Sequence, residues 1–150
     1  MRCGKRLKVT IQEVTTSSPE ETLALGRRLA AELEAPALVL LYGELGTGKT
    51  TLVKGIVSGL GVANEAEVTS PSFVFVHAYH NHRRVYHVDL YRIEQAAELE
   101  TLGLDDLLAE QAVVLVEWAE RLRLPALQPA LRIHLRALGD EQRGIRVERE

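Results

Sequence analysis

Several residue types that mark secreted or membrane-bound proteins are scarce in this sequence. Cys3 is the only cysteine among 150 residues, which excludes an internal disulfide framework. No apolar run approaches the roughly 18 residues that a membrane span requires. The 18 basic and 21 acidic residues give a net charge of -3, so no overall attraction to nucleic acid or to an anionic membrane is expected. We therefore expect a cytoplasmic protein without a membrane anchor or a disulfide partner.

The length and the apolar content set the scale of the fold. A chain of 150 residues with 46% hydrophobic residues can form one domain with its own core, but it is short for two. The sequence shows no internal repeat, low-complexity tract or long linker. We expect a single domain over residues 1–150, in which residues 1–7 are basic, lack the apolar core of a signal peptide and form a frayed end.

The segment 43–50 contains the most informative motif. It reads Gly-Glu-Leu-Gly-Thr-Gly-Lys-Thr, which fills every specified position of the pattern G-x-x-x-x-G-K-[ST]. Its glycines allow a tight turn whose inward amides wrap the phosphates of ATP at the start of a helix. Lys49 would lie between the outer two phosphates, and the Thr50 hydroxyl would bind Mg2+. The predicted nucleotide-binding residues are Gly43, Glu44, Leu45, Gly46, Thr47, Gly48, Lys49, Thr50 and Thr51.

The hydrophobic patterns around this motif are those that the motif requires. Residues 37–41 form a continuous apolar run, typical of a parallel strand buried on both faces, and residues 49–60 follow a helical period. Further strands are expected at 8–14, 74–79, 85–90, 113–116, 131–138 and 144–148, and further helices at 19–33 and 94–108. These elements predict an α/β P-loop NTPase fold, with a mostly parallel central sheet, antiparallel hairpin additions and helices on both faces.

Two acidic residues at strand ends are the candidates for a metal site. Glu117 ends the strand at 113–116, and Asp89 lies at the end of the strand at 85–90. In doubly wound folds the carboxyl ends of strands meet at the ligand site, and phosphoryl transfer needs a carboxylate near the metal. The predicted metal residues are Thr50, Glu117 and Asp89, and the sequence does not decide which carboxylate binds directly. Lys49, Asp89 and Glu117 are the catalytic candidates.

A hydroxyl-rich turn and a tryptophan are candidates for segments that respond to nucleotide. The turn consists of Thr69, Ser70, Pro71, Ser72 and Phe73. Many P-loop proteins keep the segment that senses the terminal phosphate at this position, and an ordinary loop is an equal alternative. Trp118 follows Glu117 directly and is either a packing residue or a gate at the metal site.

Four histidines lie close together in the sequence without forming a convincing metal site. Strand alternation divides them between two faces, and no cysteine or acid completes a tetrahedral set. We expect them on the surface of a hairpin. They are His77, His80, His82 and His87.

Together these segments resemble the bacterial TsaE family (formerly YjeE). The resemblance spans residues 18–120 approximately and comprises the motif at 43–50, the turn at 69–73, His-Val-Asp-Leu-Tyr-Arg at 87–92 and Val-Glu-Trp at 116–118. Many ATPases share the first segment, whereas the other three at these separations are more specific. The resemblance implies the ATPase of tRNA threonylcarbamoyladenosine biosynthesis, which acts with TsaB and TsaD partners and meets tRNA only through their complex.

The resemblance also implies roles for individual residues. Thr50 and Glu117 would hold Mg2+, Asp89 would support hydrolysis or the metal, and Trp118 with the turn at 69–73 would respond to nucleotide. Residues 16–18 would lie near the adenine, and nothing specific is implied for the tail beyond residue 124. The family ATPase does not transfer the threonylcarbamoyl group, and its hydrolysis would reset the partner complex between turnovers.

Other functions fit the motifs less well. A GTPase would need an Asn/Thr-Lys-x-Asp motif and a D-x-x-G switch, and the sequence has neither. A small-metabolite P-loop kinase is the alternative, although 150 residues leave little room for an acceptor site and a lid. A nucleotide-binding module that seldom turns over is compatible with a partner-dependent ATPase, because no arginine finger is evident. We expect a Mg2+-dependent ATPase that is slow alone and stimulated by its partners.

Overall fold

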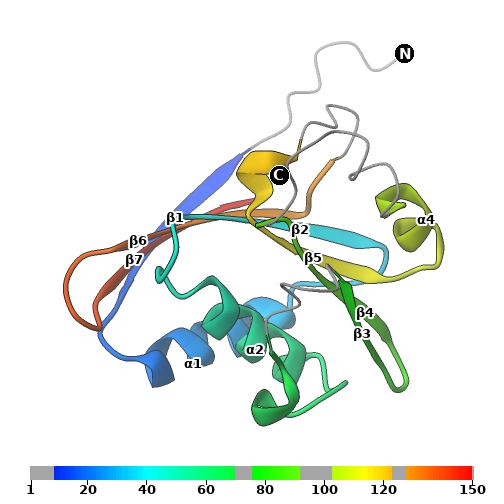
Figure 1. The fold of residues 1–150 in the computed structure, drawn as a ribbon, viewed down its shortest axis with the longest axis horizontal. Helices are drawn as coiled ribbons and strands as arrows, with labels where there is room; N and C mark the ends of the chain where they lie inside the picture. Colours follow the sequence, from blue (N-terminus) through cyan, green and yellow to red (C-terminus); the bar gives the residue numbers. More distant parts are fainter. Residues whose placement is uncertain (1–8, 70–75, 92–102, 123–127, 150) are drawn as a thin grey trace.

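The computed structural model describes residues 9–69, 76–91, 103–122 and 128–149. Within these residues, seven strands form one sheet in the order β1-β7-β6-β2-β5-β4-β3 (Figure 1). The strands are β1 (Thr10–Thr16), β2 (Ala37–Tyr42), β3 (Val76–His80), β4 (Arg84–Asp89), β5 (Val113–Glu117), β6 (Leu131–Ala137) and β7 (Arg143–Arg149). The described helices are α1 (Pro19–Ala30), α2 (Lys49–Gly59) and α4 (Leu104–Ala109), with 3-10 turns η1 (Glu65–Glu67) and η2 (Ala119–Arg121).

The centre of the sheet is parallel and both flanks are antiparallel. Strands β6, β2, β5 and β4 run parallel, whereas β7 and β1 on one side and β3 on the other are antiparallel to their neighbours. Three of the six strand pairings are therefore parallel and three are antiparallel. This arrangement agrees with the expected mostly parallel central sheet with antiparallel hairpin additions, and β1 is a further antiparallel strand that belongs to neither hairpin. The two expected hairpins, β3–β4 and β6–β7, are confirmed.

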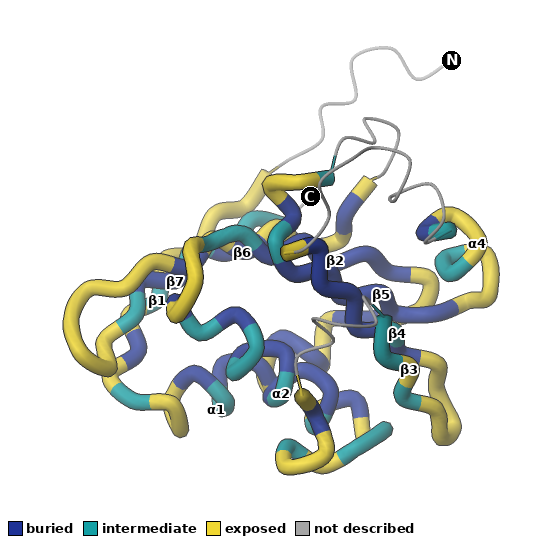
Figure 2. Tube along the Cα trace, viewed as in Figure 1, coloured by how far each residue is buried: buried dark blue, intermediate teal, exposed yellow. Residues whose placement is uncertain are grey.

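Both faces of the sheet are covered by described helices, as expected. Figure 2 shows β2 and β5 as a buried stretch through the middle of the molecule. Val39 and Leu41 of β2 pack in a core with α1 and α2, while Leu38 and Leu40 pack in a second core that includes Leu104 of α4. The continuous apolar run of β2 follows from this burial on two faces, since each fully buried leucine contributes roughly 1.5–3 kcal/mol.

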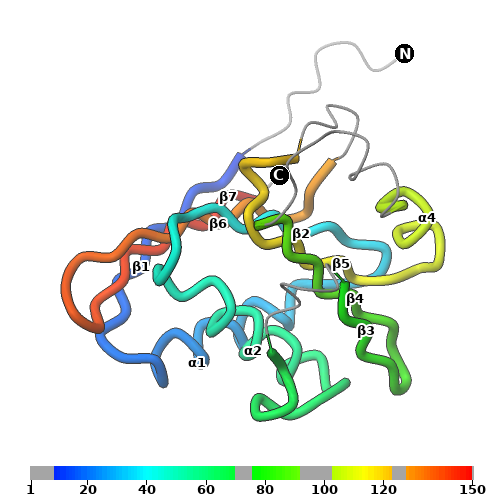
Figure 3. Tube along the Cα trace, viewed as in Figure 1, coloured from blue at the N-terminus to red at the C-terminus, as the bar shows by residue number. Residues whose placement is uncertain are grey.

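Helices α1 and α2 lie side by side beneath the sheet, at a distance that glycine permits. A Cβ atom added to Gly26 would lie 2.5 Å from the carbonyl oxygen of Leu52. One added to Gly55 would collide with the carbonyl oxygen of Leu23. The chain passes from β2 through a short loop into α2 (Figure 3), so this close contact also fixes the position of the loop.

Most remaining differences from the expected elements lie at their ends. The helix expected at 19–33 ends at Ala30, and the strand expected at 8–14 runs from Thr10 to Thr16 because its pairing with β7 continues to Arg143. The helix expected at 94–108 is described only from Leu104 onward. Residues 1–7 lie outside the described residues.

Of the helices that the structure describes, none has the length and apolar character needed to cross a membrane.

Candidate functional site

A pocket of about 510 Å3 lies at the carboxyl ends of the parallel strands. Among the predicted site residues, its walls include Asp89, Glu117 and Trp118. The loop after β2 and the start of α2 contribute Leu45, Gly46, Gly48, Lys49, Thr50 and Thr51. Predicted site residues that are up to 73 positions apart in the chain (45 and 118) therefore meet in one pocket, as the strand order requires.

The loop between β2 and α2 has the backbone that its glycines predict. Gly46 and Gly48 have φ angles of 80° and 97°, in the left-handed region. Gly48 is the N-cap of α2, and no side chain of the described residues caps this helix. The first amides of α2 are thus left for an anion, which the helix dipole also favours. Thr47 lies inside the loop, where its hydroxyl donates a 2.8 Å hydrogen bond to the Glu44 carbonyl.

Lys49 is buried beside the loop that precedes it. Lys49 is only 4% exposed. Its Nζ atom donates hydrogen bonds to the carbonyl oxygens of Gly43, at 2.5 Å, and Glu44, at 2.8 Å. Nζ also lies 4.0 Å from the centre of the Trp118 ring, within range of a cation–π interaction. Burial lowers the pKa of Lys49, and the negative charge of Glu117 and other nearby acids opposes this shift.

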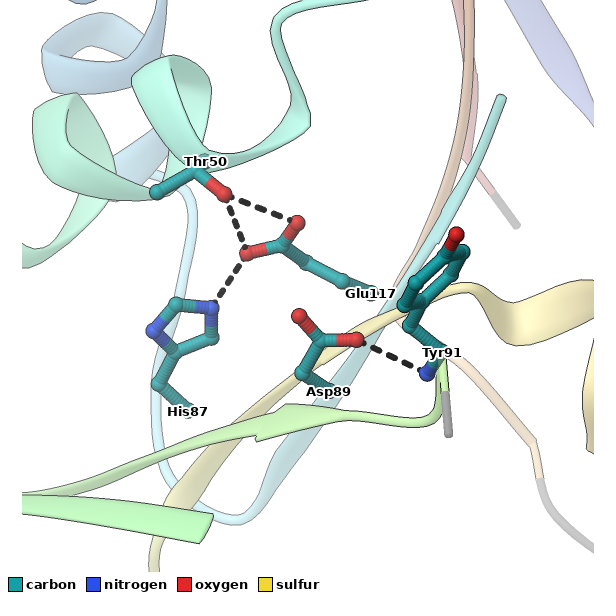
Figure 4. A network of polar contacts seen from close by, with 5 residues as sticks. All are labelled: Thr50, His87, Asp89, Tyr91 and Glu117. Carbon is teal, nitrogen blue, oxygen red and sulfur yellow. Dashed lines mark hydrogen bonds and ion pairs between the residues drawn. The ribbon is translucent and has the colours of Figure 1, made fainter. Parts of the chain in front are cut away.

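Thr50 and the two predicted carboxylates converge beside Lys49 (Figure 4). The Thr50 hydroxyl donates to both oxygens of Glu117, at 3.0 and 2.9 Å. Asp89 and Glu117 are paired in the register of β4 and β5, and they are 3% and 2% exposed. Oδ1 of Asp89 accepts a 2.8 Å hydrogen bond from the amide of Tyr91. The arrangement brings a hydroxyl and two carboxylates together next to a lysine.

His87 is the clearest correction to the sequence analysis. Instead of lying on a hairpin surface, it is completely buried, and its Nε2 lies 2.5 Å from Oε2 of Glu117. Strand alternation places His87 on the same face of β4 as Asp89, so the period-two pattern could have indicated it. The sequence does not give the strand register, which pairs His87 with Leu115 and so brings its ring within reach of the Glu117 side chain two residues further on. His80 and His82 are exposed, as expected.

Several residues in or next to the pocket were not predicted from the sequence. Glu120, in the middle of η2, accepts a 2.8 Å hydrogen bond from the Gly43 amide and so holds the beginning of the loop. Glu141 and Arg143 reach the pocket from the β6–β7 hairpin, while Pro19 and Thr22 reach it from α1. The latter two lie just after residues 16–18, the segment that the resemblance places near the adenine.

The candidate switch residues are only partly described. Trp118 has left-handed backbone angles, φ 59° and ψ 43°, and its ring lies 4.9 Å from that of Tyr91. It therefore contacts the pocket lysine on one side and Tyr91 on another. Thr69 is exposed, and Ser70, Pro71, Ser72 and Phe73 lie outside the described residues.

The fold and the site define a mixed α/β protein with a pocket lined by buried charged side chains at the carboxyl ends of its parallel strands. The family model described as "Threonylcarbamoyl adenosine biosynthesis protein TsaE" matches residues 16–145. This match covers most of the sequence, so the chain belongs to the TsaE family.

Individual relatives and a solved structure agree with this assignment. The chain is 40% identical to the tRNA threonylcarbamoyladenosine biosynthesis protein TsaE of Bacillus subtilis, over 87% of this chain and 80% of the relative. It is 34% identical to the protein of the same name from Treponema pallidum, over 87% of this chain and 95% of the relative. The crystal structure of Bacillus subtilis YdiB superposes with a TM-score of 0.74 at 33% identity, covering 96% of this chain and 88% of the other.

Proposed function

We propose that this chain binds and hydrolyses ATP with Mg2+ in tRNA threonylcarbamoyladenosine modification, acting on a complex of TsaB- and TsaD-type proteins without transferring the group itself. The observation that carries the proposal is the contact between the Thr50 hydroxyl and the Glu117 carboxylate, at 2.9 and 3.0 Å. This contact lies at the first turn of a helix that follows the glycine-rich loop. The family membership supports the assignment to this modification system.

The loop and Lys49 supply the means of binding a triphosphate. The amides at the start of α2 bind phosphate oxygens without needing a charged partner of their own. Lys49 donates to two neutral carbonyls in this conformation, and phosphate oxygens would replace them as stronger, charge-assisted acceptors. Binding therefore exchanges contacts inside the loop for contacts to the nucleotide.

The residues beside Lys49 fit a magnesium ion. Hydroxyl and carboxylate oxygens are the protein ligands that Mg2+ prefers, and Thr50 and Glu117 would hold the ion with Asp89 as a second carboxylate nearby. Bound Mg2+ would neutralise charge on the terminal phosphates. The hydrogen bond from the Tyr91 amide fixes the Asp89 carboxylate, which supports a role for Asp89 in orienting the attacking water.

Two exposed apolar residues support a function in a complex. Leu45 is 74% exposed and Tyr91 is 40% exposed, and both line the pocket. A protein partner that bound over the pocket would cover both side chains. A partner at this position would close the site, so hydrolysis by the chain alone would be slow. Transfer RNA would then be reached through the complex.

ATPase measurements on the purified chain test the proposal. We expect slow hydrolysis by the chain alone and faster hydrolysis when TsaB- and TsaD-type proteins and unmodified tRNA are added. GTP serves as the matched control nucleotide and should be a poorer substrate. Equal turnover with and without the partners would contradict the partner-dependent function. If calorimetry detects no binding of ATP or ADP at saturating Mg2+, the proposal of a nucleotide-binding site is itself contradicted.

A further inference from the structure

The hydrogen bond between His87 and Glu117 links the predicted metal site to the interior of the sheet. His87 lies in the middle of β4 and is completely buried, and its Nε2 is 2.5 Å from Oε2 of Glu117 (Figure 4). The same oxygen accepts the 2.9 Å hydrogen bond from the Thr50 hydroxyl. A rigid ring on a central strand therefore contacts the side chain that the proposed function assigns to Mg2+.

The contact places Nε2 of His87 where it can donate to Glu117. A carboxylate that holds Mg2+, as the proposed function assigns to Glu117, accepts hydrogen bonds, and this role requires donation from Nε2. Nδ1 of His87 has no hydrogen-bond partner among the described residues. A second hydrogen on Nδ1 would leave a buried donor unsatisfied there, which is costly. Donation from Nε2 alone therefore satisfies the contact without adding a buried donor at Nδ1.

We propose that His87 is a positioning residue, which holds the Glu117 carboxylate against Thr50 so that both side chains present their oxygens to Mg2+. This inference rests on the proposed function. Glutamate has three rotatable side-chain bonds, and the Thr50 hydroxyl holds only the end of this side chain. A hydrogen bond from a buried ring removes this freedom before the ion arrives, as outer hydrogen-bond partners of metal ligands do in other proteins.

A matched pair of substitutions distinguishes the effect of losing the hydrogen-bond donor from the effect of losing the volume of the ring. His87→Gln keeps an N–H group at about the reach of Nε2, whereas His87→Met has a similar length and no donor. Calorimetry would measure ATP affinity in EDTA and as a function of Mg2+ concentration for both variants and the original protein. The readout is the Mg2+ concentration that gives half of the gain in ATP affinity.

We expect His87→Met to need about 10 to 100 times more Mg2+ than the original protein, in line with the loss of outer partners elsewhere. Its ATP affinity in EDTA should stay within about twofold of the original, because the contacts of Lys49 and the loop amides remain. His87→Gln should restore most of the Mg2+ affinity. Unchanged Mg2+ dependence in the Met variant would overturn the positioning role. Absence of any Mg2+ effect in the original protein would instead contradict the proposed function.

A measurement on the unsubstituted protein covers the case in which the Met variant does not fold. Nitrogen-15 labelling of the histidines distinguishes a ring nitrogen that carries hydrogen from one that does not, and comparison with His87→Gln assigns the His87 signals. We expect hydrogen on Nε2 and none on Nδ1. A ring with hydrogen on Nδ1 alone would exclude donation to Glu117 and would overturn the inference.

Discussion

The parallel strands carry a pocket at each end, and the two pockets differ in where their charges lie. The pocket at the carboxyl ends, about 510 Å3, contains the buried side chains of Lys49, Asp89 and Glu117. The pocket at the amino ends of β4 and β5, about 430 Å3, is lined by Arg84 and Glu110. These two form a 2.9 Å ion pair whose side chains are 47% and 38% exposed.

The difference supports the proposed function at the carboxyl ends of the strands. Removing an ion from water costs several kcal/mol, which only well-placed partners offset, whereas an exposed ion pair contributes about 1 kcal/mol or less. Burial of a lysine and two acids at one end therefore favours a binding or catalytic role over a purely stabilising one. Pocket size alone would not separate the two ends, and the burial of charge does.

Lys49→Ala should produce the largest effect on nucleotide binding. Removing the ammonium group takes away a charge-assisted contact to phosphate, and loss of one partner of a buried charge pair costs about 2–5 kcal/mol. We expect ATP affinity to fall by about 30-fold or more, measured by calorimetry. Lys54→Ala, on the same helix and outside the pocket lining, is the control and should bind normally. Normal ATP affinity in the Lys49 variant would contradict the assignment of nucleotide binding to the pocket at the carboxyl ends.

Glu117→Ala should affect turnover more than binding. Phosphate contacts from the loop and Lys49 remain, so nucleotide affinity without Mg2+ should stay near that of the original protein. Mg2+-dependent hydrolysis with partners should fall by about 100-fold, comparable with the loss of one electrostatic group in other active sites. Glu110→Ala, in the pocket at the amino ends, is the matched acidic control. Full activity in the Glu117 variant would indicate that Asp89, and not Glu117, is the carboxylate that holds the metal.

The sequence predicted those parts of the site that depend on contiguous residues. The motif at 43–50 contains its own turn, lysine and hydroxyl, and the apolar runs before Asp89 and Glu117 marked the strand ends that carry them. The central parallel strands were predicted for the same reason. A strand buried on both faces, such as β2, is apolar throughout, and this run of contiguous residues is visible in the sequence.

The parts that the sequence did not predict depend on contacts between distant elements. His87 and Glu117 are 30 residues apart and meet only through the register of β4 and β5. Arg143 reaches the pocket because β7 pairs back against β6 after a turn whose carbonyls its guanidinium binds. Neither contact leaves a periodic pattern, because each concerns a single side chain whose partner is set by the three-dimensional fold.

Gly55→Ala tests whether the functional pocket depends on how α2 is held. The added methyl group would collide with the Leu23 carbonyl and push α2 away from α1, and overpacking of this kind costs about 1–3 kcal/mol. We expect a lower free energy of unfolding in urea together with weaker ATP binding, since α2 carries Lys49 and Thr50. Ser58→Ala on the same helix should change neither by a comparable amount. Weaker stability with intact ATP binding would mean that the site tolerates a displaced α2.

Tyr86→Phe should give the smallest effect and should spare the functional pocket. The Tyr86 hydroxyl donates a 2.7 Å hydrogen bond to Glu110, and this bond, together with burial, raises the pKa of Tyr86 above its ordinary value. A phenol whose pKa is raised by folding contributes stability below the pKa of the unfolded chain, about 10, and loses it as the pH rises through the folded pKa. We expect Tyr86→Phe to lower the free energy of unfolding by about 1 kcal/mol or less at pH 7 to 9, because the pair is partly exposed. In urea titrations at pH 7, 9 and 11 the difference from the original protein should shrink at the highest pH, while ATP affinity at pH 7 stays unchanged. A difference that grows above pH 10 would reverse the sign of this contribution, and weaker ATP binding would show that the two ends of the sheet are coupled.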